Sequence, residues 1–195
     1  MRHRSFVAVS IVFGGLLVGC RRVAPMRMDS SVPVSLAISP DGGLGQRFTA
    51  TFEDPKGGSH IREVTVSVMS GGLRPGDRKK WSAKECLMRY DVQAQKIFLV
   101  PNVGGMYGTH AAKAGSSATL ENSQCTVMAA QASSEISGKT LTVKLTVEFA
   151  PEFAGEKRVY LSSGDLDGVW SANYQQAFGS LTVADLKMPQ NLSKN

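Results

Sequence analysis

The stretch LTVKLTVEF, residues 141–149, carries the strongest structural signal in the chain. Its apolar residues occupy every second position, and Thr, Lys or Glu fills each position between them. Successive side chains of a β-strand point to opposite faces of a sheet, so strict alternation puts one face on a core and the other in water. The stretch therefore predicts a half-buried strand of an antiparallel sheet.

The same period of two recurs on both sides of this stretch, in segments bounded by turns rich in Gly or Pro. The candidate strands are residues 35–38, 47–53, 63–68, 86–92, 97–100, 125–129, 141–149, 158–161 and 180–183. Residues 86–92 and 97–100 should pair as a hairpin, and no segment of 11 or more residues has a convincing helical period. We therefore expect an all-β, antiparallel β-sandwich of about nine strands, formed by residues 32–185 as one domain.

Composition excludes several classes of protein. The 195 residues are 42% hydrophobic and 19% charged, which fits a globular domain and not a disordered chain. The net charge of +6 would fall to +4 if a leader containing Arg2 and Arg4 were removed. A net charge of this size, spread over the chain, does not make the concentrated basic surface that a nucleic-acid interface needs. The triplet Lys79-Lys80-Trp81 is too short to form one. We expect no nucleic-acid partner.

The N-terminal residues have the order of a secretory leader. Basic residues 2–4 precede an uncharged apolar run over residues 6–18, which as a helix would be about 20 Å long and too short to cross a membrane. The next residues, Leu17-Val18-Gly19-Cys20, resemble the bacterial lipobox, at which the Cys is lipidated and the chain is cleaved before it. The alternatives are an uncleaved signal anchor, or a plain signal peptide in which Cys20 is incidental.

The lipobox resemblance implies a signal peptide over residues 1–19, followed by a lipidated Cys20 and a tether that together span residues 20–31. Two or three acyl chains hold a protein durably on a membrane, whereas one chain holds it only marginally. Cys20 is followed directly by Arg21 and Arg22, and the absence of an acidic residue at these positions favours the outer membrane over the inner one. We therefore expect a lipid-anchored protein of the bacterial cell envelope, with residues 186–195 as a flexible C-terminal tail.

Export also predicts a disulfide. Once Cys20 carries lipid, Cys86 and Cys125 are the two remaining cysteines, and an oxidising compartment favours a bond between them. The loop that they would close has about 40 residues, for which the chain-entropy model gives about 4 kcal/mol of stabilisation.

Several short segments follow one another in a specific order from residue 34 onward. They are residues 34–40, 48–55, Cys86, 120–125, 141–143, Phe149, 153–157 and 159–160. Together they resemble an Ig-like, fibronectin-type-III-like β-sandwich repeat of secreted and surface proteins of environmental bacteria. This resemblance implies an Ig-like sandwich in which Cys86 is bonded to Cys125, without enzymatic activity. An antibody-type domain is disfavoured, because Trp81 and Trp170 do not lie between the two cysteines.

Two histidines remain after export, His60 and His110, and both lie in Gly-rich loops. Neither belongs to a catalytic or zinc-binding motif, and the chain has no Gly-x-Ser-x-Gly, phosphate-binding or dinucleotide-binding sequence. We interpret both histidines as solvated loop residues and expect no enzymatic activity, no metal and no cofactor. A hydrolase would require one of them to meet a Ser and a carboxylate at hydrogen-bonding distance.

Two further groups allow two interpretations each. The sequence Asp165-Leu166-Asp167-Gly168 resembles part of a calcium loop, but the closing Glu does not follow, and a plain turn explains it equally well. Trp170 and Tyr174 could form an aromatic platform for a sugar, although burial of one or both at the sandwich edge is the interpretation that we favour.

The sequence thus predicts a non-enzymatic, lipid-anchored envelope protein that presents one β-sandwich for structural or adhesive contact with another protein. The alternative is a carbohydrate- or peptide-binding module whose site lies on loops at residues 104–110 or 165–174. A binding module should expose clustered aromatic side chains in a concave patch, and a structural protein need not.

Overall fold

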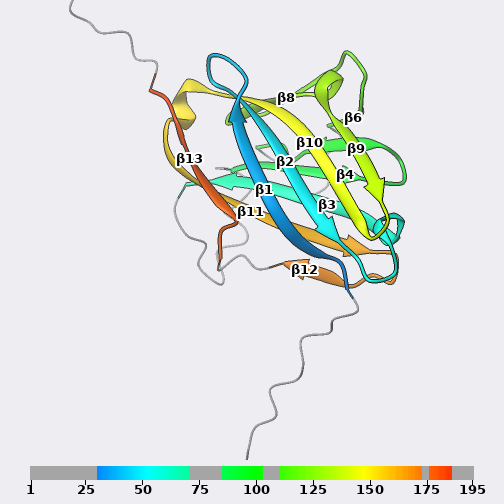
Figure 1. Ribbon diagram of the computed structural model, residues 1–195. Coiled ribbons are helices and arrows are strands. Elements are labelled where there is room, and N and C mark those ends of the chain that lie inside the picture. Colours follow the sequence, from blue (N-terminus) through cyan, green and yellow to red (C-terminus); the bar gives the residue numbers. More distant parts are fainter. Residues whose placement is uncertain (1–29, 71–84, 103–109, 173–175, 186–195) are drawn as a thin grey trace, which may run out of the picture.

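The computed structural model describes residues 30–70, 85–102, 110–172 and 176–185. Within these ranges the chain forms thirteen β-strands in two antiparallel sheets that pack as a β-sandwich (Figure 1). Short 3-10 helices lie in the connections at Gly58–His60 (η1), Ala129–Gln131 (η3) and Pro151–Phe153 (η4). The predicted all-β sandwich is confirmed.

The first sheet has six strands in the order β1-β2-β10-β8-β7, with β9 also paired to β10. Their bounds are Val32–Pro40 (β1), Gly45–Glu53 (β2), Thr119–Glu121 (β7), Cys125–Met128 (β8), Ser133–Ser137 (β9) and Thr140–Phe149 (β10). β9 pairs with the first half of β10 and β8 with its last three residues, so the two short strands follow one another along one edge of β10.

The second sheet has seven strands in the order β12-β11-β3-β4-β5-β6, with β13 also paired to β11. Their bounds are Ile61–Met69 (β3), Glu85–Asp91 (β4), Lys96–Leu99 (β5), Ala111–Lys113 (β6), Gly155–Asp165 (β11), Trp170–Ala172 (β12) and Gly179–Val183 (β13). β13 pairs with the start of β11 and β12 pairs near its end, whereas β3 pairs with residues 158–165 along the opposite edge of β11.

The alternation in β10 fills the core between the sheets. Its apolar positions are all buried, whereas Lys144 and Glu148 on the other face are exposed. The ring of Phe149 meets Phe48 of β2 edge to face, with centroids 6.4 Å apart. Burial of each large apolar side chain contributes about 1.5–3 kcal/mol, so the period of two drives the packing of the two layers.

Cys86 and Cys125 form the predicted disulfide, with an S–S distance of 2.04 Å and a Cα–Cα distance of 5.8 Å. Cys86 lies on β4 of the second sheet and Cys125 on β8 of the first, so the bond joins the two sheets through the core. Both residues are fully buried, as part of the hydrophobic core cluster.

All nine predicted strands occur, and the described residues contain four more, so the predicted number was too low. Three of the additional strands, β6, β7 and β12, have only three residues each, too few to show a period of two. The fourth, β9, is exposed at four of its five positions and therefore has no apolar alternation. These four strands form because they hydrogen-bond to a neighbouring strand that has the apolar alternation. Their own sequences give little indication of strand structure.

The predicted hairpin is present as β4 and β5, in which Met88 pairs with Leu99 and Asp91 with Lys96. The strands as a whole begin at Val32 and end at Val183. The predicted signal peptide, Cys20 and the tail 186–195 lie outside the described residues. No helix in the described part of the chain has both the length and the apolar composition needed to cross a membrane.

Candidate functional site

Two aspartates lie at the ends of strands of opposite sheets, on the side that faces the core. Asp54 directly follows β2 and lies two positions after the buried Phe52, so its side chain points to the same inward side. Asp165 is the last residue of β11 and keeps the inward phase of Leu161. Both aspartates are 0% exposed, and a buried carboxylate is unfavourable unless other groups compensate its charge. Groups that compensate this charge are therefore expected beside the two aspartates.

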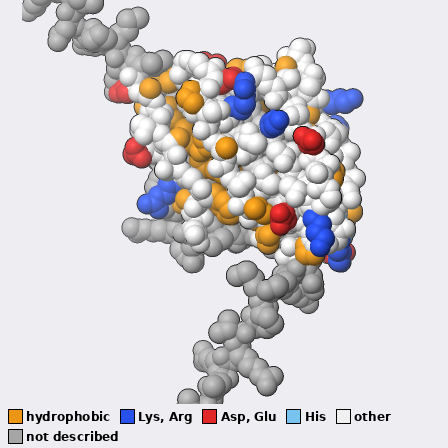
Figure 2. All heavy atoms as spheres, in the orientation of Figure 1, with side chains coloured by type: hydrophobic (Ala, Val, Ile, Leu, Met, Phe, Trp, Pro, Cys, Tyr) orange, Lys and Arg blue, Asp and Glu red, His pale blue; other side chains and the backbone are white. Residues whose placement is uncertain are grey.

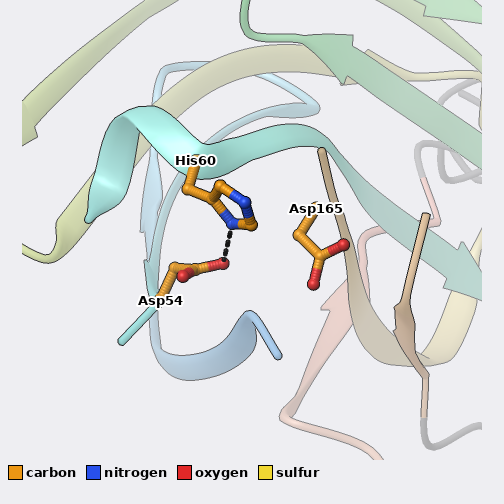
Figure 3. A group of neighbouring side chains, drawn as sticks. All are labelled: Asp54, His60 and Asp165. Carbon is orange, nitrogen blue, oxygen red and sulfur yellow. Dashed lines mark hydrogen bonds and ion pairs between the residues drawn. The ribbon is translucent and has the colours of Figure 1, made fainter. Parts of the chain in front are cut away.

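His60 of η1 lies beside both aspartates (Figure 3). Its Nδ1 is 3.1 Å from Oδ2 of Asp54, and its side chain is only 17% exposed. One nitrogen or carboxylate oxygen from each of Asp54, His60 and Asp165 lies within 4.8 Å of the other two. We call these three residues the Asp-His-Asp cluster.

A tight turn after β2 fixes the Asp54 carboxylate. Its Oδ1 accepts a hydrogen bond from the backbone N–H of Lys56 at 2.8 Å, and its backbone carbonyl accepts one from Gly57 at 3.0 Å. Gly57 has a φ of +120°, which L side chains rarely adopt. Gly58 packs so closely on β10 that an added Cβ would lie 2.5 Å from the carbonyl oxygen of Thr140. Glycine is therefore required at both positions for the chain to enter η1.

A β-bulge and a second turn hold Asp165. The register of β11 against β3 shifts between Gly164, which pairs with Glu63, and Asp165, which pairs with Ile61. The shift skips Arg62 of β3, so Asp165 stays on the inward side of β11, opposite the buried Ile61. Oδ1 of Asp165 accepts a hydrogen bond from the backbone N–H of Val169 at 2.8 Å. Its Oδ2 is buried and has no hydrogen-bond partner among the described residues.

Asp167 and Lys56 lie on the solvent side of the cluster, and each is about half exposed. Oδ1 of Asp167 is 3.6 Å from Nε2 of His60, and the Lys56 ammonium forms a hydrogen-bonded ion pair with Oδ2 of Asp167. The hydrogen bond from Lys56 lowers the pKa of Asp167, and the same bond raises the pKa of Lys56. The backbone N–H of Leu166 donates to the His60 carbonyl at 3.0 Å, so this turn is tied to η1.

The structure corrects the interpretation of His60 as a solvated residue, because both of its ring nitrogens face carboxylates and most of its side chain is buried. His110 is exposed, as the sequence predicted. Asp165 and Asp167, which the sequence grouped in one turn, lie in different environments. Asp165 is inside the sandwich end, and Asp167 is at the surface.

Asp54 is the member of the cluster that sequence reasoning missed. The residues Asp54-Pro55-Lys56-Gly57-Gly58 were explained by turn formation alone. A signal was nevertheless available, because Asp54 lies two positions after Phe52 and therefore on the inward phase of a strongly alternating strand. An aspartate on that phase at a strand end points toward the interior unless the chain turns first.

Trp170 is 42% exposed, so this one of the two aromatic residues is not buried at the sandwich edge. Its ring packs on the backbone of β11 at Gly164, where an added Cβ would lie 2.9 Å from Cε2 of the indole. A strand glycine often marks such a close approach. Tyr174, Cys20 and the Lys79-Lys80-Trp81 triplet lie outside the described residues, as do residues 104–109 of the first candidate loop.

A second polar group lies on the face of β3 and β4 that points away from the core. Ser67 Oγ donates a hydrogen bond to Oε2 of Glu85 at 3.1 Å, and both residues are buried. Burial raises the pKa of Glu85 to about 6, and the hydrogen bond from Ser67 partly offsets that rise. On the same face, Arg89 donates to Oε2 of Glu63 at 2.7 Å. These carboxylates have hydrogen-bond donors, unlike Oδ2 of Asp165.

No family model matches this chain, and no curated protein or solved structure matches it either. The geometry itself defines the class: an antiparallel β-sandwich with a disulfide between its sheets and a buried Asp-His-Asp cluster at one end. The resemblances to the Ig-like repeat and to the lipobox stay predictions.

Proposed function

We propose that this protein is a non-enzymatic lipoprotein of the bacterial cell envelope, and that it presents one Ig-like β-sandwich for structural or adhesive contact with another protein. The observation that carries the proposal is the buried disulfide between Cys86 and Cys125. Disulfides persist in exported proteins and are rare in the reducing cytoplasm, so the bond supports export. Residues 1–20 have the form of a leader that would bring about this export.

The proposed anchor is Cys20, with residues 21–31 as the tether to β1, which begins at Val32. Eleven extended residues reach about 35 Å, enough to hold the sandwich clear of the lipid headgroups. Arg21 and Arg22 would add about 1 kcal/mol each near an anionic membrane surface. The absence of an acidic residue directly after Cys20 favours the outer membrane.

The position of the disulfide supports the Ig-like assignment. In immunoglobulin domains the characteristic disulfide also joins the two sheets of the sandwich. Antibody domains in addition pack a buried Trp against that bond, whereas Trp170 here is exposed. We therefore propose that the sandwich is of the bacterial Ig-like repeat type and not of the antibody type.

A band of hydrophobic side chains supports contact with a protein. Figure 2 shows hydrophobic side chains gathered on the face that carries β1 and β13. Val34 and Phe178 are exposed, and Leu36 and Ile38 are half-buried against the core and adjoin Gly179 of β13. Contiguous exposed apolar surface is typical of interaction sites.

The environment of His60 supports the absence of nucleophilic catalysis. Such catalysis needs a hydroxyl or thiol beside the imidazole and a carboxylate behind it. Nδ1 of His60 faces Asp54 and Nε2 faces Asp167, so carboxylates lie on both sides of the ring. Reactive substrate analogues of serine hydrolases should therefore fail to label the protein.

Cell fractionation and mass spectrometry test the anchor. In a Gram-negative host the N-terminal peptide from the outer membrane should begin at Cys20 and carry acyl chains, and Cys20→Ser should move the protein to soluble fractions. Met26→Ala in the tether is the matched control and should stay in the membrane. If Cys20→Ser also stayed there, the lipobox interpretation would be wrong.

Site-specific photocrosslinking in cells tests the contact. A photoreactive residue at Val34 should form an adduct with another envelope protein. The same residue at Lys144, exposed on the outer face of β10, should not form one. Equal labelling at both positions, or none at Val34, would contradict the proposed contact surface.

The exposed ring of Trp170 favours a second candidate, a carbohydrate- or peptide-binding module. A thermal-shift screen against envelope glycans and peptides should then raise the melting temperature, and Trp170→Ala should abolish the rise. No shift across the panel would leave protein contact as the better proposal.

A further inference from the structure

We propose that the Asp-His-Asp cluster binds one divalent transition-metal ion of the zinc type, with Asp54, His60 and Asp165 as its protein ligands. This inference goes beyond the proposed envelope contact and does not depend on it. The sequence analysis expected no metal. The folded chain changes that expectation, because it brings together three ligand-type side chains from the turn after β2, from η1 and from the end of β11.

Buried oxygen atoms without a partner point to a missing positive group. Oδ2 of Asp165 has no hydrogen-bond partner among the described residues, although the residue is 0% exposed. Oγ of Ser163, two positions earlier on the same face of β11, and Oγ of Ser31 are buried and unpartnered too. Ser31 directly precedes Val32, which pairs with Glu53 beside Asp54. A buried carboxylate oxygen with no donor is strongly unfavourable, and a cation would neutralise it.

The ligand types favour a transition metal over calcium. Ca²⁺ and Mg²⁺ take oxygen ligands, whereas imidazole nitrogen suits zinc and its neighbours. In a tetrahedral site with metal–ligand bonds of about 2.0–2.1 Å, the ligand atoms lie about 3.3 Å apart. Nδ1 of His60 and Oδ2 of Asp54 already have this spacing, at 3.1 Å. One oxygen of the Asp165 carboxylate lies within 4.8 Å of both other ligand atoms, so it would move closer to them when the ion binds.

Asp167 supplies the outer contact that a metal-binding histidine requires. A histidine that binds a metal through one nitrogen nearly always donates its other N–H to a carboxylate or carbonyl, which sets its tautomer and orientation. With Nδ1 of His60 directed at the cluster, Nε2 faces Oδ1 of Asp167 at 3.6 Å. This distance is slightly longer than a hydrogen bond, so Asp167 is the residue that would orient the His60 ring by accepting that bond once the ion is bound.

The ion would connect the two sheets at the end of the sandwich opposite the disulfide. On β3, Val68 pairs with Cys86 at one end, and Ile61 pairs with Asp165 at the other. A metal held by Asp54 and Asp165 would join the first sheet to the second, as the disulfide does at the opposite end. It would do so beside the start of β1, where the proposed tether joins the domain.

Isothermal titration of the full chain with ZnCl₂, after treatment with EDTA, tests the proposal. The chain carries Cys20→Ser, so that no free thiol competes for the metal, and has no histidine tag. One Zn²⁺ should bind per chain. His60→Gln and Asp165→Asn should each weaken binding at least about tenfold, and His110→Gln is the matched control that leaves the affinity unchanged. Equal concentrations of CaCl₂ should not displace the zinc.

Co²⁺ provides a readout that needs no variant. The unsubstituted cluster should give a visible Co²⁺ absorption that one equivalent of Zn²⁺ abolishes, and Zn²⁺ should raise the melting temperature of the chain. The proposal is overturned if zinc shows no saturable one-to-one binding, if calcium saturates the site instead, or if His60→Gln binds zinc as the parent does. Loss of binding in His110→Gln would equally overturn it, by moving the site away from the cluster.

Discussion

Cys86 and Cys125 lie on opposite sheets, and the disulfide between them is at the end of the sandwich opposite the Asp-His-Asp cluster. The pairing along β3 shows this directly, because Val68 pairs with Cys86 and Ile61 with Asp165. One end of the sandwich is therefore held by a covalent bond and the other by polar side chains. The two ends should respond to different conditions.

Replacing either cysteine of the disulfide with Ala should lower the free energy of unfolding by the same amount. The sequence separation of 39 residues corresponds to a loss of about 4 kcal/mol at most, because the unfolded chain is no longer constrained. Combining Cys86→Ala with Cys125→Ala should add little, since either substitution already removes the bond. Urea unfolding of the three variants measures this, and the parent in dithiothreitol is the control. Additive losses would contradict the bond.

The buried Glu85 should make the protein less stable as the pH rises from about 4.5 to about 6, with no further loss from this group at higher pH. Its pKa is about 6 in the folded protein and 4.5 in the unfolded chain, so the folded state binds the extra proton more tightly. The resulting stabilisation is complete below pH 4.5 and is lost as the pH rises through 6. The full loss amounts to about 2 kcal/mol. Urea unfolding between pH 4 and pH 8 measures it.

Glu85→Gln removes this titration and can still accept the hydrogen bond from Ser67. It should flatten the pH dependence and stabilise the protein at pH 8, with little effect at pH 4. Glu148→Gln, at an exposed position of β10, is the matched control and should keep the parent profile. An unchanged slope in Glu85→Gln would show that another group causes the pH dependence.

Gly164 should be required for the position of Trp170. An Ala Cβ at this position would lie 2.9 Å from Cε2 of the indole, so the ring must move away from β11. We expect Gly164→Ala to shift the Trp emission to longer wavelength and to lower stability by about 1 kcal/mol. The measurement uses a Trp81→Phe background, so that Trp170 is the one fluorophore of its kind. Ser171→Ala on β12 is the control and should leave the emission unchanged.

Phe48 should be among the most sensitive core positions. It is 0% exposed and meets Phe149 edge to face, so Phe48→Ala removes both the buried area and the ring contact. Phe48→Ala should lower the free energy of unfolding by about 3–5 kcal/mol, and Phe48→Leu should lower it by clearly less. Thr49→Ala, a neighbour on the outward face of β2, should change the unfolding midpoint only slightly. A small effect of Phe48→Ala would contradict the close packing of the two sheets.

The period of two was sufficient to predict the long strands and the layered fold. β2, β3 and β10 have nine or ten residues, long enough for alternation to be visible and for its inward phase to bury a large apolar area. β6, β7 and β12 could not be found in this way. They exist because a patterned neighbour offers free hydrogen-bonding groups, which their own residues do not reveal.

The candidate site was predictable only in fragments. Asp165 and Asp167 were recognised as possible ligands, and His60 as a histidine in a Gly-rich loop, but nothing local connected them. Asp54 could be placed only weakly from the sequence. Its position two residues after Phe52 indicates an inward side chain, but the turn residues that follow it already explain an aspartate there. Contact among these residues depends on which strands end at the same end of the sandwich, a property of sheet order and stacking.

The amino acids alone were enough to predict an all-β sandwich with a bond between Cys86 and Cys125, because the alternation is visible in the local pattern and only two cysteines remain if Cys20 carries lipid. Only the tertiary structure decided that Asp54, His60 and Asp165 meet. The ends of β2 and β11 belong to different sheets, and the stacking of those sheets together with the bulge before Asp165 brings the two carboxylates to one histidine.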